Sequence, residues 1–101
     1  MARPVKRRRI DCVPVANYFK PAGIPLRDLE EIVLGLDELE AMRLTDLEKL
    51  YQQDAAEKMG VSRQTIGNIL KSAHQKLADA LLNGKALRIS SLEDESEDSS
   101  S

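Results

Sequence analysis

The sequence predicts a mainly α-helical fold: a small helix-turn-helix domain of three to four helices, with a long C-terminal helix. The 101 residues suffice for one domain. With no Trp, one Phe and two Tyr, the core must be built mostly from aliphatic side chains, which suits helices better than a β-sandwich. Residues 52–69 have the pattern of a helix, a turn at Gly60 and a second helix that begins at Ser62. The rest of the chain is expected to support this unit, to add contacts to its ligand or to form a tail.

The N-terminus is expected to be a flexible basic arm over residues 1–9. It has no apolar periodicity and carries five cations, which are Arg3, Lys6, Arg7, Arg8 and Arg9. Beside a helix-turn-helix, such an arm favours contacts with DNA phosphates or with the minor groove. A solvated charge run that aids solubility is the alternative interpretation.

The next segment, residues 10–27, is expected to be extended, because its prolines interrupt any helix. KPAG at 20–23 predicts a turn. Tyr18 and Phe19 are expected to pack onto the helical core, although aromatic rings at these positions could also stack on bases.

Two helices are expected before the helix-turn-helix. Pro25 suits the first turn of a helix, which would continue for about two turns until Gly35 breaks it. Asp37 would then cap a helix that runs to about Asp46, with an apolar face of Leu36, Leu39, Met42 and Leu44. The connection that follows is expected to keep Leu47 and Leu50 for the core.

The helix-turn-helix itself is predicted from side-chain size and conformation. Ala55, Ala56 and Met59 would face inward from the first helix, and the small Ala56 lets the two helices cross closely. Gly60 can take the left-handed conformation that ends this helix, and Val61 would plug the turn into the core.

Ser62 is the expected cap of the last helix, which would extend to about Leu82. Its apolar stripe follows a period of 3.6 residues and consists of Ile66, Ile69, Leu70, Ala73, Leu77, Ala80 and Leu81. Beyond Asn83-Gly84, residues 85–90 predict a short strand with Leu87 and Ile89 on one face. Its only candidate partner is the stretch at 10–13, which would give a two-stranded pairing.

Residues 91–101 are acidic and have no apolar periodicity, so we expect a disordered tail after a domain at 10–90. The tail either solubilises the protein or folds back on the basic arm and competes with DNA.

Charge is strongly segregated along the chain, although the net charge is only −2. Residues 1–27 carry +6 and residues 58–91 carry +5, whereas residues 28–57 carry −8 and residues 92–101 carry −5. The two positive blocks are the N-terminus and the segment that holds the last helix. An overall acidic protein can therefore still bind a polyanion.

Composition excludes several other classes of protein. Cys12 is the only cysteine, so no intrachain disulfide can form, and no apolar run reaches the ~20 residues of a membrane span. The basic start has no apolar stretch after it, so it is not a signal peptide. We expect a cytoplasmic protein with no membrane partner.

No set of residues has the pattern of a catalytic or metal site. His74 and Cys12 are the only His and Cys, and they lie in separate segments without an orienting third group. A structural zinc site needs about four ligands. We therefore expect no enzyme, no metal and no cofactor, and His74 is expected at the surface.

The helix-turn-helix instead points to double-stranded DNA. Counted from Gln52, the small, glycine and apolar slots of the twenty-residue template are filled by Ala56, Gly60, Val61, Ile66 and Ile69. The outward positions of the second helix that can hydrogen-bond base edges in the major groove are Arg63, Gln64, Thr65 and Asn68. Ser62, Lys71 and Ser72 are placed for backbone phosphates, together with the arm. An ordinary helical hairpin with a polar face is the alternative.

Several stretches in fixed order closely resemble uncharacterised protein family 0251, also called domain of unknown function 134. They are MARP at the start, YFKPAGIPL at 18–26, LDELEAMRLTDLE at 36–48 and AAEKMGVSRQTIGNIL at 55–70, followed by ADAL and GKALRI. The family is prokaryotic and is described as DNA-binding on the strength of the same helix-turn-helix. Residues 36–82 also resemble the fourth region of sigma-70-type factors, a three-to-four-helix unit without a wing.

The chain departs from this family pattern at two positions. Asn68 stands where the family commonly has Arg, which removes one positive contact and bears on base preference. Tyr51 stands where Asp is frequent, which removes a cap from the first motif helix and costs about 1 kcal/mol.

Together these features predict a sequence-specific DNA-binding protein that regulates transcription. The alternative is a protein-interaction module of the sigma-like type, in which the acidic block at 28–57 faces a basic partner in the transcription machinery. A homodimer on two half-sites is compatible with the fold, and the late turns of the long helix at 77–82 are the one candidate surface for it.

Overall fold

The computed structural model describes residues 9–11 and 13–90. Within them lie three helices, α1 (Leu36–Met42), α2 (Gln52–Met59) and α3 (Arg63–Asn83), and three strands, β1 (Tyr18–Phe19), β2 (Glu31–Leu34) and β3 (Ala86–Ile89). The mainly helical fold with a long last helix is confirmed. Arg3, Lys6, Arg7, Arg8, Cys12 and the acidic tail lie outside the described residues.

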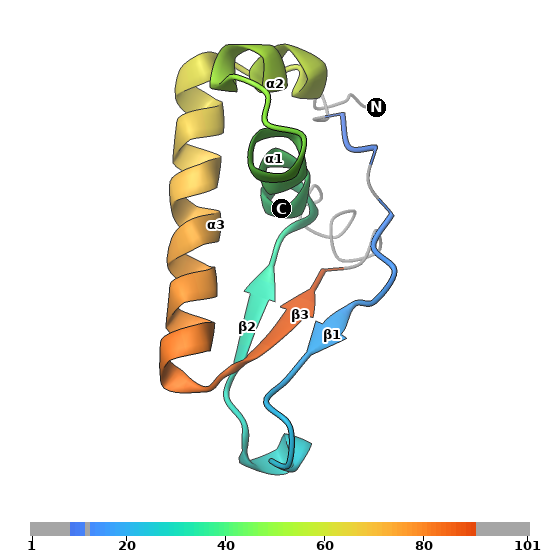
Figure 1. Ribbon diagram of the computed structural model, residues 1–101, viewed down its shortest axis with the longest axis vertical. Coiled ribbons are helices and arrows are strands. Elements are labelled where there is room, and N and C mark those ends of the chain that lie inside the picture. Colours follow the sequence, from blue (N-terminus) through green and yellow to red (C-terminus); the bar gives the residue numbers. More distant parts are fainter. Residues whose placement is uncertain (1–8, 12, 91–101) are drawn as a thin grey trace, which may run out of the picture.

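The two motif helices and α1 share one aliphatic core. α2 crosses the start of α3, and α1 lies between α3 and the N-terminal segment (Figure 1). The buried members of this core come from all three helices and from the turn that follows α1, and they are Ala41, Leu44, Ala55, Ala56, Met59, Ile66, Ile69 and Leu70. The inward positions predicted for α2 are confirmed, because Ala55, Ala56 and Met59 are all buried.

A second, smaller core joins the sheet to the middle of α3. Leu34 of β2, Ile89 of β3, Leu36 and Ala73 are buried there. Met42 packs against both cores. The helix-turn-helix and the sheet are therefore parts of one packed unit.

The predicted C-terminal strand exists, but its predicted partner is wrong. β3 is the central strand of a three-stranded sheet in the order β1-β3-β2, antiparallel to β1 and parallel to β2. Tyr18 and Phe19 supply β1 instead of packing into the helical core, and Phe19 is exposed. The expected wing-free helical unit thus carries a small mixed sheet, to which Ile10, Asp11 and Val13 do not contribute.

The predicted helix after Pro25 is also wrong. Only Leu26–Asp28 form a short 3₁₀ turn, and residues 31–34 are strand β2. The physical reason is pairing with β3, whose register matches Ile32 to Leu87 and Leu34 to Ile89. Leu34 is buried and the alternate residues Glu31 and Val33 are exposed, the two-residue period of a strand with one covered face.

α1 begins two residues earlier than predicted, with Gly35 rather than Asp37 at its N-cap. Glu38 supplies the local bond, because the Gly35 N–H donates to Glu38 Oε1 at 2.7 Å. After Met42 the helix continues as a wider π-helical turn to Leu47. Leu50 packs against the core as predicted, whereas Leu47 is 75% exposed, so its predicted burial is wrong.

α3 matches the predicted boundaries, and Gly84 ends it in the left-handed conformation with φ of 68°. Five members of its predicted stripe are buried, and Leu77 is half-buried. Leu81 is 79% exposed, so its predicted place in the buried stripe is wrong.

Candidate nucleic-acid interface

The turn between α2 and α3 has the geometry of a helix-turn-helix. Gly60 adopts φ 72° and ψ 33°, a left-handed conformation that costs an L-residue roughly 1–2 kcal/mol. Its N–H donates to the last carbonyls of α2, and the Val61 N–H donates to Ala56 O at 3.0 Å. Val61 then packs against the core, as predicted. The turn therefore fixes the direction in which α3 leaves α2.

Ser62 caps α3 through its side chain, as predicted. The Thr65 N–H donates to Ser62 Oγ at 3.0 Å, and Ser62 Oγ–H donates to Thr65 Oγ1 at 2.8 Å. The two hydroxyl groups thus face each other within the cap. Of the four residues predicted to read bases, Thr65 is the one that is half-buried.

The other three predicted readers lie in the open. Arg63, Gln64 and Asn68 are exposed, and Lys71 and Gln75 follow them one and two turns along α3. We call Arg63, Gln64, Asn68 and Lys71 the recognition face, and Gln75 lies beyond it on the same helix. α3 contains no acidic residue from Arg63 to Ala78, so the recognition face presents only cations and neutral hydrogen-bonding groups.

Ser72, predicted as a phosphate contact, instead bonds inside the protein. Its hydroxyl donates to Glu38 Oε2 of α1. Glu38 is 7% exposed, and Lys76 Nζ donates to its Oε1 at 2.8 Å. Burial alone would raise the pKa of this carboxyl, but the hydrogen bonds from Lys76, Ser72 and the Gly35 N–H outweigh it and lower the pKa. Ser72 is therefore a poor candidate for a phosphate contact, whereas Lys71 remains exposed.

Arg9, the last residue of the predicted arm, lies against the end of α2. Its N–H donates to Met59 O at 2.9 Å, and its Nη2 donates to Glu57 O at 2.9 Å. Arg9 therefore lies beside the turn of the helix-turn-helix, and the segment after it runs past α1 toward β1 (Figure 1).

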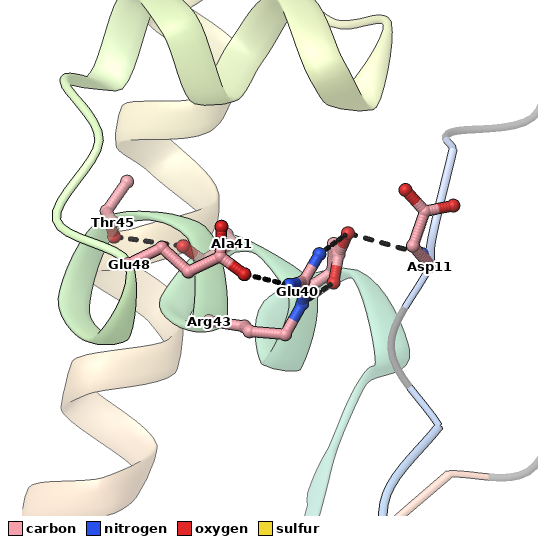
Figure 2. A network of polar contacts seen from close by, with 6 residues as sticks. All are labelled: Asp11, Glu40, Ala41, Arg43, Thr45 and Glu48. Carbon is pink, nitrogen blue, oxygen red and sulfur yellow. Dashed lines mark hydrogen bonds and ion pairs between the residues drawn. The ribbon is translucent and has the colours of Figure 1, made fainter.

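The buried carboxylate of Glu40 holds the N-terminal segment at Asp11, two residues after Arg9. The Asp11 N–H donates to Glu40 Oε2 at 3.2 Å (Figure 2). Glu40 is 1% exposed and pairs with Arg43, whose Nε lies 2.8 Å from Glu40 Oε1 and which also bonds Glu48. A buried carboxylate is costly unless it is paired and hydrogen-bonded, and this network meets both conditions.

Glu38 and Glu40 are two structurally important carboxylates of α1 that the sequence pattern does not single out. Both are buried, and each binds a segment distant in sequence. In the sequence they stand two residues apart on a short helix. This spacing does not reveal hydrogen-bond partners 29 and 34 residues away.

His74 lies at the surface as predicted, with its Nε2 2.7 Å from Asp46 Oδ2. The described residues contain no group of three or more His, Cys, Asp or Glu side chains that could hold a metal ion. None of the helices in 9–11 and 13–90 is long and apolar enough to cross a membrane.

The described surface also has an open apolar groove of about 750 Å³ beside α1 and α3. The exposed Val13, Val15, Phe19 and Leu47 form its rim, and Leu39, Met42, Leu77 and Ile89 are among the residues that line it.

Comparison with known proteins gives a family. The family described as "Protein of unknown function DUF134" matches residues 1–96. A UPF0251 protein of Moorella thermoacetica is 57% identical over 89 residues, which are 88% of this chain and 60% of the relative. UPF0251 proteins of Desulforudis audaxviator and Methanocella arvoryzae are 54% and 57% identical, over 58% and 54% of their lengths. The chain thus spans little more than half of these relatives. No solved structure matches it.

Proposed function

The chain belongs to the DUF134 family of proteins of unknown function, and we propose that it is a sequence-specific double-stranded-DNA-binding protein that regulates transcription. α3 would enter the major groove from its capped N-terminus, as the second helix does in helix-turn-helix proteins.

The recognition face carries this proposal. It begins at the N-terminus of α3, next to the turn, where the second helix of this motif contacts base edges. Arg63 can donate two hydrogen bonds to guanine O6 and N7, and Gln64 and Asn68 can each bond adenine through one donor and one acceptor atom. Lys71 lies one turn further and can neutralise a phosphate. The absence of carboxylates from Arg63 to Ala78 removes the repulsion that would otherwise oppose a polyanion.

A matched pair of glutamines tests the proposal. Gln64 and Gln75 are both exposed on α3, but Gln75 lies 11 residues further along, roughly 16 Å at 1.5 Å per residue. We expect Gln64→Ala to weaken binding to a selected site by about 1–3 kcal/mol and to relax selectivity at one base pair. Gln75→Ala controls for the loss of a glutamine and should leave selectivity unchanged.

The measurement is site selection from random duplexes with the purified protein, followed by mobility shifts at two salt concentrations. Failure of the unaltered protein to shift any duplex at low salt would exclude the proposed function. Equal weakening of all sequences by Gln64→Ala would exclude base readout by this residue.

The second candidate is a protein-interaction module of the sigma-like type. The apolar groove favours it, because exposed apolar patches of this kind commonly mark interaction sites. Leu47→Asp on the groove rim separates the two candidates. It should leave DNA binding unchanged if α3 reads DNA, and it should abolish partner binding if the groove is the functional surface.

A further inference from the structure

The side chain of Arg63, the first residue of α3, lies beside the start of α2. A Cβ built on Gly67 would lie 3.7 Å from Arg63 Nη1 and also 3.7 Å from Gln52 Oε1. Gly67 follows Arg63 by four residues and so lies on the same side of α3. Gln52 is the first residue of α2. The guanidinium and the amide oxygen therefore meet over Gly67 from two different helices.

The crossing of the two helices explains why these groups meet. α2 lies across the beginning of α3 (Figure 1). Ala55, Ala56 and Ile66 are buried in the core that the two helices share. This packing fixes the first turn of α2 beside the first turns of α3. Because Gly67 has no side chain, the space over it is left to Arg63 and Gln52.

Both polar groups have unused capacity for hydrogen bonds. Arg63 is exposed and Gln52 is half-buried, and neither side chain forms a hydrogen bond or an ion pair with another residue in the described part of the chain. A guanidinium has five N–H donors, and an amide oxygen has two lone pairs that accept. Guanine takes two donors through its O6 and N7 atoms. Other donors of Arg63 then remain for Gln52.

A long, exposed arginine reads a base better when a neighbour holds it. Its side chain loses much of its rotamer freedom when it is held in one geometry. An acceptor beside the guanidinium restricts it before the duplex binds, so less of this cost is left to the binding step. The plane of the N–H fork must also match the edge of guanine, because the two hydrogen bonds are parallel.

We propose that Gln52 is a positioning residue that holds the Arg63 guanidinium in the orientation that reads guanine. Its Oε1 accepts a hydrogen bond from an N–H of the guanidinium that does not face the base, and Gln52 itself does not contact the base. This inference rests on the proposed function. It adds a residue of the first motif helix to those that determine which base pair is preferred.

A double-mutant cycle in the full chain tests this role, with Gln52→Met, Arg63→Ala and their combination. Site selection with Arg63→Ala identifies the guanine whose preference depends on Arg63. The readout is the guanine preference, which is the ratio of affinities for the selected duplex and for the same duplex with another base pair at that position. Because one protein binds both duplexes, a partial loss of folded protein cancels in this ratio.

We expect Gln52→Met to lower the guanine preference roughly fivefold, the effect of one ordinary hydrogen bond. In the Arg63→Ala background it should have no further effect. Met is nearly as long as Gln but has only a weak acceptor. Gln52→Ala repeats the measurement if Gln52→Met folds poorly, since Ala is the best helix former.

Gln53→Met is the matched control. Gln53 is the next residue of α2, is exposed and has no atom within 4 Å of the Cβ built on Gly67, so its substitution should leave the guanine preference unchanged. Gln52→Glu is the conservative variant, because it retains an acceptor beside the guanidinium. It should keep the guanine preference, although its added charge weakens binding to every duplex.

Three results would overturn the positioning role. They are an unchanged guanine preference in Gln52→Met, an equal fall with and without Arg63, and a loss of preference in Gln52→Glu as large as in Gln52→Met. The second result would make Gln52 a direct contact to the base pair. Failure of the unaltered chain to shift any duplex would refute the proposed function, whereas selective binding that does not depend on Gln52 would refute this inference alone.

Discussion

The hydroxyl of Ser72, in α3, donates a hydrogen bond to the carboxylate of Glu38, near the start of α1. The same carboxylate accepts bonds from Lys76 Nζ and from the Gly35 N–H, at 2.8 and 2.7 Å. Glu38 thus ties the end of β2, the first turn of α1 and the middle of α3 together. Because α3 carries the recognition face, this buried cluster sets the angle at which the face is presented.

Ser72 and Lys71 should therefore behave in opposite ways although they are neighbours. Ser72→Ala should lower the free energy of unfolding by about 1.5–3 kcal/mol, the range for a hydrogen bond to a charged group, and leave the salt slope of DNA binding unchanged. Lys71→Ala should change stability by less than about 0.5 kcal/mol but reduce the salt slope by about 0.9. Urea denaturation measures the change in stability, and a salt titration of DNA binding measures the change in slope. A reduced salt slope for Ser72→Ala would mean that the Ser72 hydroxyl contacts a phosphate.

Glu38 should make stability depend on pH in the acidic range. Its pKa in the folded protein is lower than normal, so the unfolded chain binds the proton more readily. The stabilisation is then complete above the ordinary pKa of a glutamate and is lost as pH falls through the lowered value. Glu38→Gln should therefore be less stable than the unaltered protein at neutral pH, and the difference should shrink on acidification.

Thermal unfolding of both proteins between pH 7 and pH 2 checks this. Glu31→Gln is a control, because Glu31 is an exposed carboxylate outside this cluster. If the difference in stability between Glu38→Gln and the unaltered protein stays constant down to the lowest pH, the charged form of Glu38 does not stabilise the fold.

Local patterns were enough to predict the helix-turn-helix. The inward Ala56, the left-handed Gly60 and the Ser62 cap each act within a few residues, and the structure contains all three. The exposed readers Arg63 and Asn68 follow from the same 3.6-residue period. Their roles toward DNA stay predictions.

The sheet could not be predicted in the same way, because its partners are distant in sequence. β2 pairs with β3 more than 50 residues later, and the apolar residues at 26–34 fit a short helix almost as well as a strand. The β-branched pair Ile32-Val33 was the available signal for a strand. Arg9 is a similar case, because a charge pattern indicates an arm but does not reveal that a helix end holds its last residue.

Tyr51 leaves the start of α2 without a side-chain cap. It occupies the N-cap with an extended backbone, is 83% exposed and makes no capping hydrogen bond. Tyr51→Asp should raise the free energy of unfolding by about 0.5–2 kcal/mol, because the carboxylate can accept from the free N–H groups of the first turn.

Gln53→Asp is the matched control for Tyr51→Asp, since it adds the same charge to the first turn of α2 outside the cap position. Its free energy of unfolding should rise only through the interaction of the added charge with the helix dipole, by about 0.3–1 kcal/mol. Equal increases in the free energy of unfolding for both variants, measured by chemical denaturation, would show that the added charge stabilises α2 and that the capping hydrogen bond does not.

Gly67 is a glycine that the fold does not require. It lies inside α3, and a Cβ at this position would meet Arg63 Nη1 and Gln52 Oε1 at an ordinary 3.7 Å. Gly67→Ala should therefore stabilise the protein by roughly 0.8–1 kcal/mol through helix propensity. Gly84→Ala is the opposite control, because φ is +68° there and the substitution should destabilise by about 1 kcal/mol.

The effect of Gly67→Ala on DNA binding then tests how closely α3 approaches the duplex. Gly67 lies one turn after Arg63 and one turn before Lys71, so a methyl group there would project beside the recognition face. We expect weaker binding in mobility shifts although the protein is more stable, a combination that loss of folding cannot produce. A variant that is more stable and binds as tightly as the unaltered chain would show that the DNA does not pack against α3 at this position.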